Sequence, residues 1–220
     1  LNRRLPGKGE CLYVREADSL LYLATSEKWI LTYDLRNGII ESHELSLPGL
    51  EQINFLHVEP GHHIWLSDAN KGLYRISLPE NRVTWFSASF TGNRRIPHNL
   101  VRAIEQDREG NTWIGTENGL GIWSGETDKM EILTYDPLDP EGLNSNAIYE
   151  ILCDLNGNIW VGTYFGGINL WNSRSEFFNI LSEGPGEFKL GGKEVRHITE
   201  DREGNIWIGL EGKGVNVLEK

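Results

Sequence analysis

The sequence predicts an all-β fold built from repeated four-stranded antiparallel units. The chain of 220 residues holds 25 Gly, 8 Trp and a single Met, a composition that favours sheets with tight turns over helices. A segment of about 47 residues recurs along the chain. No stretch has the 3.6-residue periodicity of an amphipathic helix, so the repeat unit is expected to consist of strands.

Three copies of the repeat align without gaps. They are Val101–Trp113, Ile148–Trp160 and Val195–Trp207, and their tryptophans lie 47 positions apart. Two weaker copies precede them, Ile53–Trp65 and Glu10–Tyr22, and in the second a tyrosine takes the place of the tryptophan. Self-similarity at a fixed period is the signature of a repeat architecture.

Each copy is predicted to form four short strands. In the third copy these strands are 101–106, 112–116, 120–123 and 130–135, each with the short apolar pattern of a strand. The first connection, Asp107–Asn111, reads as a tight hairpin turn, in which the glycine can adopt a positive φ and the aspartate can accept backbone N–H groups. The same Asp-x-x-Gly-Asn pattern recurs at 154–158 and 201–205.

A four-stranded antiparallel unit with a period of about 40–50 residues is typical of a β-propeller blade. One blade cannot bury both of its faces, so blades stack, and the recurrent tryptophan is expected to lie between neighbours. We expect a single propeller region over residues 1–220, with about five blades at approximately 10–50, 51–97, 98–144, 145–192 and 193–220.

The fifth copy ends after its third strand. The head of the chain, Leu1–Gly9, holds one Pro and two Gly, which makes it a poor source of a closing outer strand. We therefore expect these blades to be part of a larger ring, completed by the remaining blades or by a second chain. A homodimer is one form of that second alternative.

The consensus V-x-x-I-x-E/C-D-x-x-G-N-x-W-I/V-G-T/L-x-x-G resembles the two-component regulator propeller repeat. Leu100–Trp123, Asn144–Trp171 and Val195–Leu218 match it closely, whereas Ile53–Ile76 and Cys11–Asp34 lack the Asp-x-x-Gly-Asn turn. The resemblance implies the periplasmic sensor region of a hybrid two-component system, best known from gut Bacteroidetes. It further implies rings that commonly have about seven blades, a glycan breakdown product as ligand, and a membrane helix and histidine kinase outside this sequence.

The charge balance argues against two classes of partner. Lys and Arg total 21 against 32 Asp and Glu, a net charge of −11. Such a surface repels phosphate backbones and anionic lipids, so neither nucleic-acid binding nor direct membrane contact is expected. No apolar run approaches the roughly 20 residues that span a bilayer.

No metal, cofactor or catalytic motif is expected. The six His do not recur at the spacing of a metal site, and the Asp-x-x-Gly-Asn turns lack the alternating ligands of a calcium loop. Cys11 and Cys153 lie three blades apart, so we expect two separate buried thiols and no disulfide. The sequence has neither a Gly-x-Ser-x-Gly elbow nor a phosphate-binding loop.

A ligand site is expected at one end of the blades. In a propeller, the turns after the second strand and the loops between blades lie on one face, and here these segments vary while the scaffold does not. The candidate ligand contacts are Asn54, Arg95, His98, Asn99, Arg102, Glu117, Asn144, Tyr149, Tyr164, Phe165, Lys193 and Arg196.

Arginine forks beside an aromatic ring are what an acidic or sulfated sugar requires, so the expected ligand is an oligosaccharide or another small polar molecule. The alternative is that the arginines pair with carboxylates of the blades and the loop residues are simply solvated. Two other functions stay open. A lyase-type enzyme similar to streptogramin lyase would use a base such as His98, and an interaction scaffold would bind a protein on an apolar patch.

Overall fold

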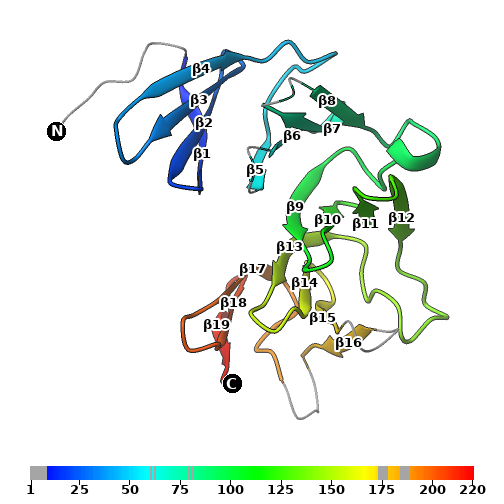
Figure 1. Cartoon of the computed structure of the whole chain (residues 1–220). Helices are drawn as coiled ribbons and strands as arrows, with labels where there is room; N and C mark the ends of the chain where they lie inside the picture. Colours follow the sequence, from blue (N-terminus) through cyan, green and yellow to red (C-terminus); the bar gives the residue numbers. More distant parts are fainter. Residues whose placement is uncertain are drawn as a thin grey trace. The chain divides into compact units, whose positions relative to one another are not determined.

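The structure is a computed structural model that describes residues 9–59, 61, 63–78, 80, 82–172, 178–183 and 189–220. Within these ranges it contains five antiparallel sheets, one short 3-10 turn at Gly92–Arg94 (η1) and no α-helix, which confirms the all-β prediction (Figure 1). No helix in the described part is long and apolar enough to cross a membrane. The expectation about the head falls mainly on residues 1–8, which lie outside the described ranges.

The chain divides into two compact units, Leu1–Phe86 and Ser87–Lys220. The first unit contains two four-stranded sheets, which we call blades one and two. Their strands are β1 (Cys11–Ala17), β2 (Leu20–Thr25), β3 (Trp29–Asp34), β4 (Ile40–Glu44), β5 (Phe55–Glu59), β6 (His63–Asp68), β7 (Gly72–Ser77) and β8 (Arg82–Phe86).

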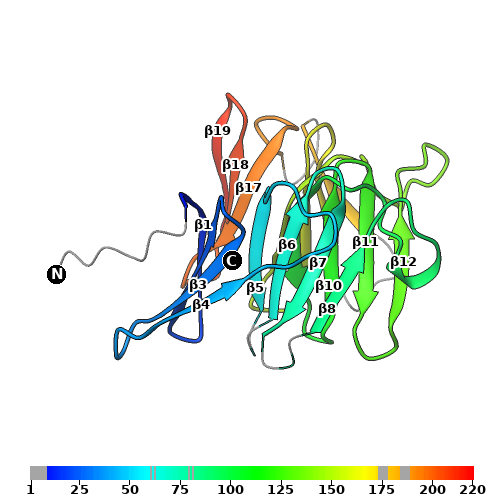
Figure 2. The same ribbon diagram turned by 90° about the horizontal axis from the view of Figure 1, so that it is seen from above.

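The second unit contains blades three, four and five, with four, four and three strands. Consecutive strands pair as antiparallel neighbours, as the arrows of β10, β11 and β12 show in Figure 2. The sheet of blade five has three strands in the described residues. The strands are β9 (Val101–Gln106), β10 (Asn111–Thr116), β11 (Gly119–Ser124), β12 (Lys129–Leu133), β13 (Ile148–Cys153), β14 (Ile159–Thr163), β15 (Gly167–Trp171), β16 (Phe178–Leu181), β17 (Val195–Glu200), β18 (Ile206–Leu210) and β19 (Gly214–Leu218).

The turn between the first two strands of each blade in the second unit has one repeated set of hydrogen bonds. Asp107 Oδ2 accepts from the indole Nε1 of Trp113 and from Asn111 Nδ2, both at 2.9 Å. The same bonds form around Asp154 and Asp201. The glycine of each turn has φ between +83° and +91°, a region that favours Gly. The predicted role of these residues in the turn is confirmed.

Two of the three tryptophans held by these aspartates, Trp113 and Trp160, lie between neighbouring blades, as predicted. Trp113 is 3% exposed and belongs to a core cluster with Ile148 of blade four. Trp160 is 7% exposed and belongs to a cluster with Val195 of blade five. Trp207 is 42% exposed, because no described sheet of the second unit follows blade five. Burying an indole against the next sheet is thus a main stabilising contact between blades.

Two glycines allow these blades to approach closely. A Cβ atom on Gly115 would lie 2.6 Å from Cγ2 of Ile148, and one on Gly162 would lie 2.6 Å from Cγ1 of Val195. At the equivalent Gly209, the nearest atom is the blade's own His197 carbonyl oxygen at 3.7 Å. The repeated Ile/Val-Gly pair after the tryptophan therefore serves the contact with the following blade.

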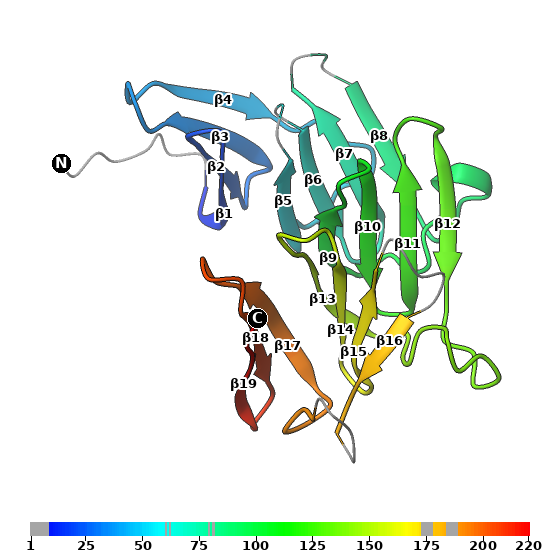
Figure 3. The same ribbon diagram turned by 60° about the horizontal axis from the view of Figure 1, so that its bottom comes forward.

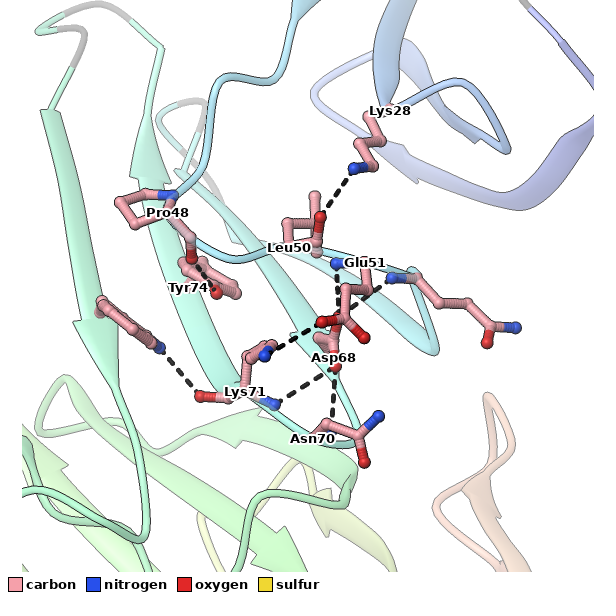
Figure 4. Close-up of polar contacts among 10 residues, drawn as sticks. Lys28, Pro48, Leu50, Glu51, Asp68, Asn70, Lys71 and Tyr74 are labelled. Carbon is pink, nitrogen blue, oxygen red and sulfur yellow. Dashed lines mark hydrogen bonds and ion pairs between the residues drawn. The ribbon is translucent and has the colours of Figure 1, made fainter.

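Blades one and two share one core in the first unit. Tyr22, which takes the tryptophan position, is fully buried in a cluster that includes Leu56 and Leu66 of blade two, so its predicted place between blades is confirmed. The loop between these blades is held by Asp68, whose carboxylate accepts the backbone N–H groups of Glu51 and Gln52 at 2.7 and 2.9 Å (Figure 4). Burial raises the pKa of Asp68, but these N–H donors outweigh it and bring the pKa below its usual value.

The cysteine prediction is only partly right. Both cysteines are free. Cys153 is half-buried, and burial raises the pKa of its thiol to about 11. Cys11, however, is exposed, so the prediction that it is a buried thiol was wrong. It starts β1, the first strand of blade one, and no other sheet of the described residues in the first unit covers it.

Candidate ligand-binding site

The first strand of each blade in the second unit begins with a bulge, and a predicted site residue occupies each bulge. In blade three, Val101 lies opposite Thr116 and Ala103 lies opposite Gly115, so Arg102 is the extra residue of the ladder. Tyr149 and Arg196 take the same place in blades four and five. A bulge turns a side chain away from the regular pleat, which gives these three residues a common position at the same end of their blades.

The turn after the second strand is fixed next to each bulge by a backbone hydrogen bond. Glu117 N–H donates to Leu100 O at 3.0 Å, and Tyr164 N–H donates to Ala147 O at 2.9 Å. Glu211 N–H donates to the carbonyl of Glu194 at 3.0 Å. The first residue of each turn therefore lies beside the bulge residue of its own blade.

Within each blade these two residues form a pair. Arg102 Nε donates to Glu117 Oε2 at 2.6 Å, and Arg196 Nη2 donates to Glu211 Oε2 at 2.7 Å. In blade four the pair is aromatic instead, because the rings of Tyr149 and Tyr164 stack with centroids 4.9 Å apart. An ion pair, an aromatic pair and a second ion pair thus follow one another along three blades.

Contacts between neighbouring blades join the three pairs into one cluster. The guanidinium carbon of Arg102 lies 4.2 Å from the ring centroid of Tyr149. That of Arg196 lies 5.0 Å from Tyr149 and 4.9 Å from Tyr164, and these distances are within cation–π range. The bulges lie on β9, β13 and β17, which run side by side (Figures 1 and 3). We call Arg102, Glu117, Tyr149, Tyr164, Arg196 and Glu211 the arginine–tyrosine cluster.

Hydrogen bonds within the cluster shift its titrations. Tyr164 hydrogen-bonds the carboxylate of Glu211, which raises the pKa of the tyrosine and lowers the pKa of the glutamate. Glu211 is therefore ionised at neutral pH. Beside the cluster, the ring of Phe165 meets Tyr164 edge-on at 4.6 Å and is 61% exposed.

Six of the twelve predicted site residues are brought together here: Arg102, Glu117, Tyr149, Tyr164, Phe165 and Arg196. The alternative expectation for the two arginines, pairing with blade carboxylates, is confirmed. Whether any of the six contacts a ligand stays a prediction.

The other predicted residues make local contacts in loops. Asn99 Oδ1 accepts from Ala88 N–H at 2.8 Å, and His98 Nδ1 accepts from Leu100 N–H at 3.1 Å. Asn144 Oδ1 accepts from Asn169 Nδ2 at 2.9 Å. Arg95 and Lys193 are exposed, and they form hydrogen bonds through backbone atoms, Arg95 N–H to Gly92 O and Gly167 N–H to Lys193 O. Asn54 belongs to the first unit, where its side chain accepts from Ala69 N–H.

Sequence reasoning missed three polar residues of this region. Glu211 was overlooked, although it lies 47 positions after Tyr164 and 94 after Glu117, so the repeat period could have found it. His197 and Glu150 were also missed. They follow the bulge residues Arg196 and Tyr149, and His197 Nδ1 lies 2.7 Å from Glu150 Oε2.

The cluster is suited to noncovalent recognition. It offers guanidinium donors, carboxylate acceptors and ring faces within one surface region. In the described ranges, no group of three or more His, Cys, Asp or Glu is arranged to hold a metal ion.

Comparison with known proteins supports the repeat interpretation. Three segments, 95–118, 142–165 and 189–212, match the family model described as two component regulator propeller. No curated protein matches the chain.

Among solved structures, the chain is similar to the extracellular domain of a candidate hybrid two component system from B. thetaiotaomicron. The TM-score is 0.70 with 26% identity, over 94% of this chain and 26% of that one. The chain thus spans about a quarter of the length of that domain.

Two further structures show likeness in fold alone. Virginiamycin B lyase from Staphylococcus aureus has a TM-score of 0.64 at 12% identity, over 94% of this chain and 68% of that one. PorZ, of the type-IX secretion system of Porphyromonas gingivalis, has a TM-score of 0.62 at 16% identity, over 94% and 32%. The propeller fold is confirmed, and the three matched segments are two component regulator propeller repeats.

Proposed function

We propose that the chain is the ligand-sensing propeller of a hybrid two component regulator and lies outside the cytoplasm. The matched repeats and the likeness to an extracellular two component domain support this role. The observation that carries it is the arginine–tyrosine cluster. At the bulge and turn positions the three repeats do not all carry the same residue types, and the side chains there nevertheless contact one another.

The ligand is proposed to be an oligosaccharide derived from a glycan. Sugars are recognised by planar polar side chains that hydrogen-bond hydroxyls and by aromatic rings that cover their apolar faces. The cluster holds two arginines and two glutamates, and Phe165 beside it is largely exposed. These groups lie on rigid strand ends and short turns, as a binding site requires.

Sensing needs no catalysis within this module. A ligand that binds one arrangement of blades better than another shifts the equilibrium between them by its difference in affinity, and a few kcal/mol are sufficient to switch a signalling protein. The kinase that reads this shift lies outside the sequence, so the chain itself is proposed to be a non-enzymatic module.

Calorimetric titration with purified oligosaccharides tests this function. The double variant Arg102→Ala/Arg196→Ala removes both guanidinium groups, and we expect the affinity to fall by at least about tenfold, or 1.4 kcal/mol. The matched control is Arg108→Ala/Arg202→Ala, which removes the same charge from the turns at the other end of the same two blades. Equal affinity in both double variants would show that the cluster does not contribute to ligand binding.

The lyase alternative has less support. The likeness to virginiamycin B lyase concerns the fold alone. The proposed base, His98, accepts the backbone N–H of Leu100 in its own loop through Nδ1. This nitrogen holds the loop and does not face a substrate as a free base. An enzyme would convert its substrate during the titration, and product would be visible by mass spectrometry.

The partner of blade five is proposed to be a further propeller blade. Its outer face exposes Trp207, Val215 and Val217. Trp207 is already held by Asp201 in the way that Trp113 and Trp160 are held in the covered interfaces. This continuity with the two preceding interfaces favours a blade of the same repeat type over an unrelated protein.

A further inference from the structure

We propose that the arginine–tyrosine cluster takes an uncharged, hydroxyl-rich ligand, a neutral oligosaccharide, and does not take the acidic or sulfated sugar that its arginines suggest in the sequence. This inference rests on the proposed sensing function and narrows its ligand class.

The first argument is the charge of the cluster. Arg102 is paired with Glu117 and Arg196 with Glu211, at N–O distances of 2.6 and 2.7 Å, so two positive and two negative charges cancel. Glu150 lies next to the cluster and carries a further carboxylate, 2.7 Å from His197. The chain as a whole has a net charge of −11. An anion would therefore meet no net positive charge, and it would have to displace a glutamate to reach a guanidinium.

The second argument is the kind of hydrogen-bond donors and acceptors that the cluster offers. A guanidinium only donates and an ionised carboxylate only accepts, whereas a sugar hydroxyl does both. Two adjacent hydroxyls can therefore bridge an arginine and its glutamate, one accepting and the other donating. An acidic group can use only the arginine and is repelled by the glutamate.

The ion pairs leave room for such bonds. Both contacts of Arg102 go to one oxygen of Glu117, Oε2, and Oε1 accepts no bond from the residues that the structure describes. The side chains of Arg102 and Glu117 are 30% and 39% exposed, and those of Arg196 and Glu211 are 44% exposed each. Both pairs are therefore accessible to a ligand without being broken.

The third argument is the accessible ring. The faces of Tyr149 and Tyr164 are engaged with each other and with the arginines. Phe165 presents an exposed ring without a charged group stacked on it in the described structure. A sugar's C–H face can cover this ring, which adds apolar contact and no demand for charge.

The test compares two classes of probe on the full chain. Laminarihexaose, xylohexaose and mannohexaose are neutral, and a galacturonic acid trimer and a chondroitin sulfate tetrasaccharide are acidic. We expect a neutral probe to bind, with a dissociation constant that changes less than about twofold between low and high salt, because screening does not affect an uncharged ligand. Binding of an acidic probe that weakens with salt would overturn this inference and leave the sensing function standing. Binding of neither class would reject the sensing function itself.

A charge-changing variant tests the pairing directly. Glu117→Gln/Glu211→Gln leaves the cluster with two uncompensated arginines, so it should gain affinity for the acidic probes, at least about fivefold tighter at low than at high salt. Glu126→Gln/Glu203→Gln removes two carboxylates elsewhere in the same unit and is the matched control for net charge. Circular dichroism verifies that both variants are folded. If acidic probes stay as weak in the cluster variant as in the control, charge pairing does not select the ligand.

Discussion

The two ends of the strands in blades three to five differ in what they repeat. At one end, the turns β9–β10, β13–β14 and β17–β18 use the same Asp, Gly and Asn three times with the same hydrogen bonds. At the other end, the turns β10–β11, β14–β15 and β18–β19 begin with Glu117, Tyr164 and Glu211. The backbone repeats at both ends. At the first end the turn side chains repeat in all three blades, whereas at the second end Thr116 and Thr163 repeat their bond to a turn carbonyl but the residue after the strand changes from Glu to Tyr to Glu.

The reason lies in which atoms hold each turn. At the repeated end an aspartate side chain holds both the turn and the indole that covers the next blade, so a change of residue type costs stability in every blade. At the variable end the turn is fixed by a backbone hydrogen bond, from Glu117 N–H to Leu100 O in blade three. Any residue other than proline keeps the N–H group that makes this bond. Selection for binding can therefore act there without loss of fold.

The largest loss of stability is expected when a buried indole is removed at the repeated end of the blades. Trp160→Ala removes an indole that is 7% exposed between blades four and five, which should lower the free energy of unfolding by about 3–5 kcal/mol. Trp207→Ala is the matched control, because the same indole position is 42% exposed there, and it should cost only on the order of 1 kcal/mol. Urea unfolding followed by far-ultraviolet circular dichroism measures both. Equal losses would mean that the indoles do not stabilise the contact between blades.

A smaller effect on stability is expected from the Asp154 turn, and it depends on pH. Burial raises the pKa of Asp154, but the bonds from Trp160 and Asn158 outweigh it, and the pKa lies below its usual value of 3.8. The carboxylate therefore stabilises the fold fully above the unfolded pKa, and this contribution is lost as the pH falls through the lower folded pKa. Asp154→Asn should cost about 1–3 kcal/mol at pH 7.

The pH dependence checks the cause of that loss. Urea midpoints of wild type and Asp154→Asn should converge as the pH falls from about 5 toward 2. A difference that stays constant over this range would show that the ionised carboxylate is not what stabilises the turn.

Much of the fold could be predicted from the sequence, because its determinants are local. The strand limits, the Asp-x-x-Gly-Asn turn and the buried Trp113 and Trp160 follow from alternation, turn chemistry and the repeat period. The exposed Cys11 was not predicted, since its burial depends on whether another sheet precedes blade one.

The candidate site was predictable only in part. The bulges that bring Arg102, Tyr149 and Arg196 to one position depend on the register between strands, which residue types alone do not specify. Local polar bonds explain why His98 and Asn99 do not join the cluster. The pairing of each arginine with a glutamate could be inferred only by aligning Glu211 with Glu117, which holds the same position in the repeat 94 residues earlier.

The most direct test of the separation between scaffold and recognition is thermal unfolding with and without the neutral oligosaccharide that binds most tightly. Arg102→Ala/Arg196→Ala should unfold within about 2 °C of wild type in the absence of the sugar and should lose the sugar's stabilising shift. Trp160→Ala should unfold at a clearly lower temperature and keep that shift. If the arginine variant is as unstable as the tryptophan variant, or if it keeps the full shift, the two ends of the blades do not have separate roles.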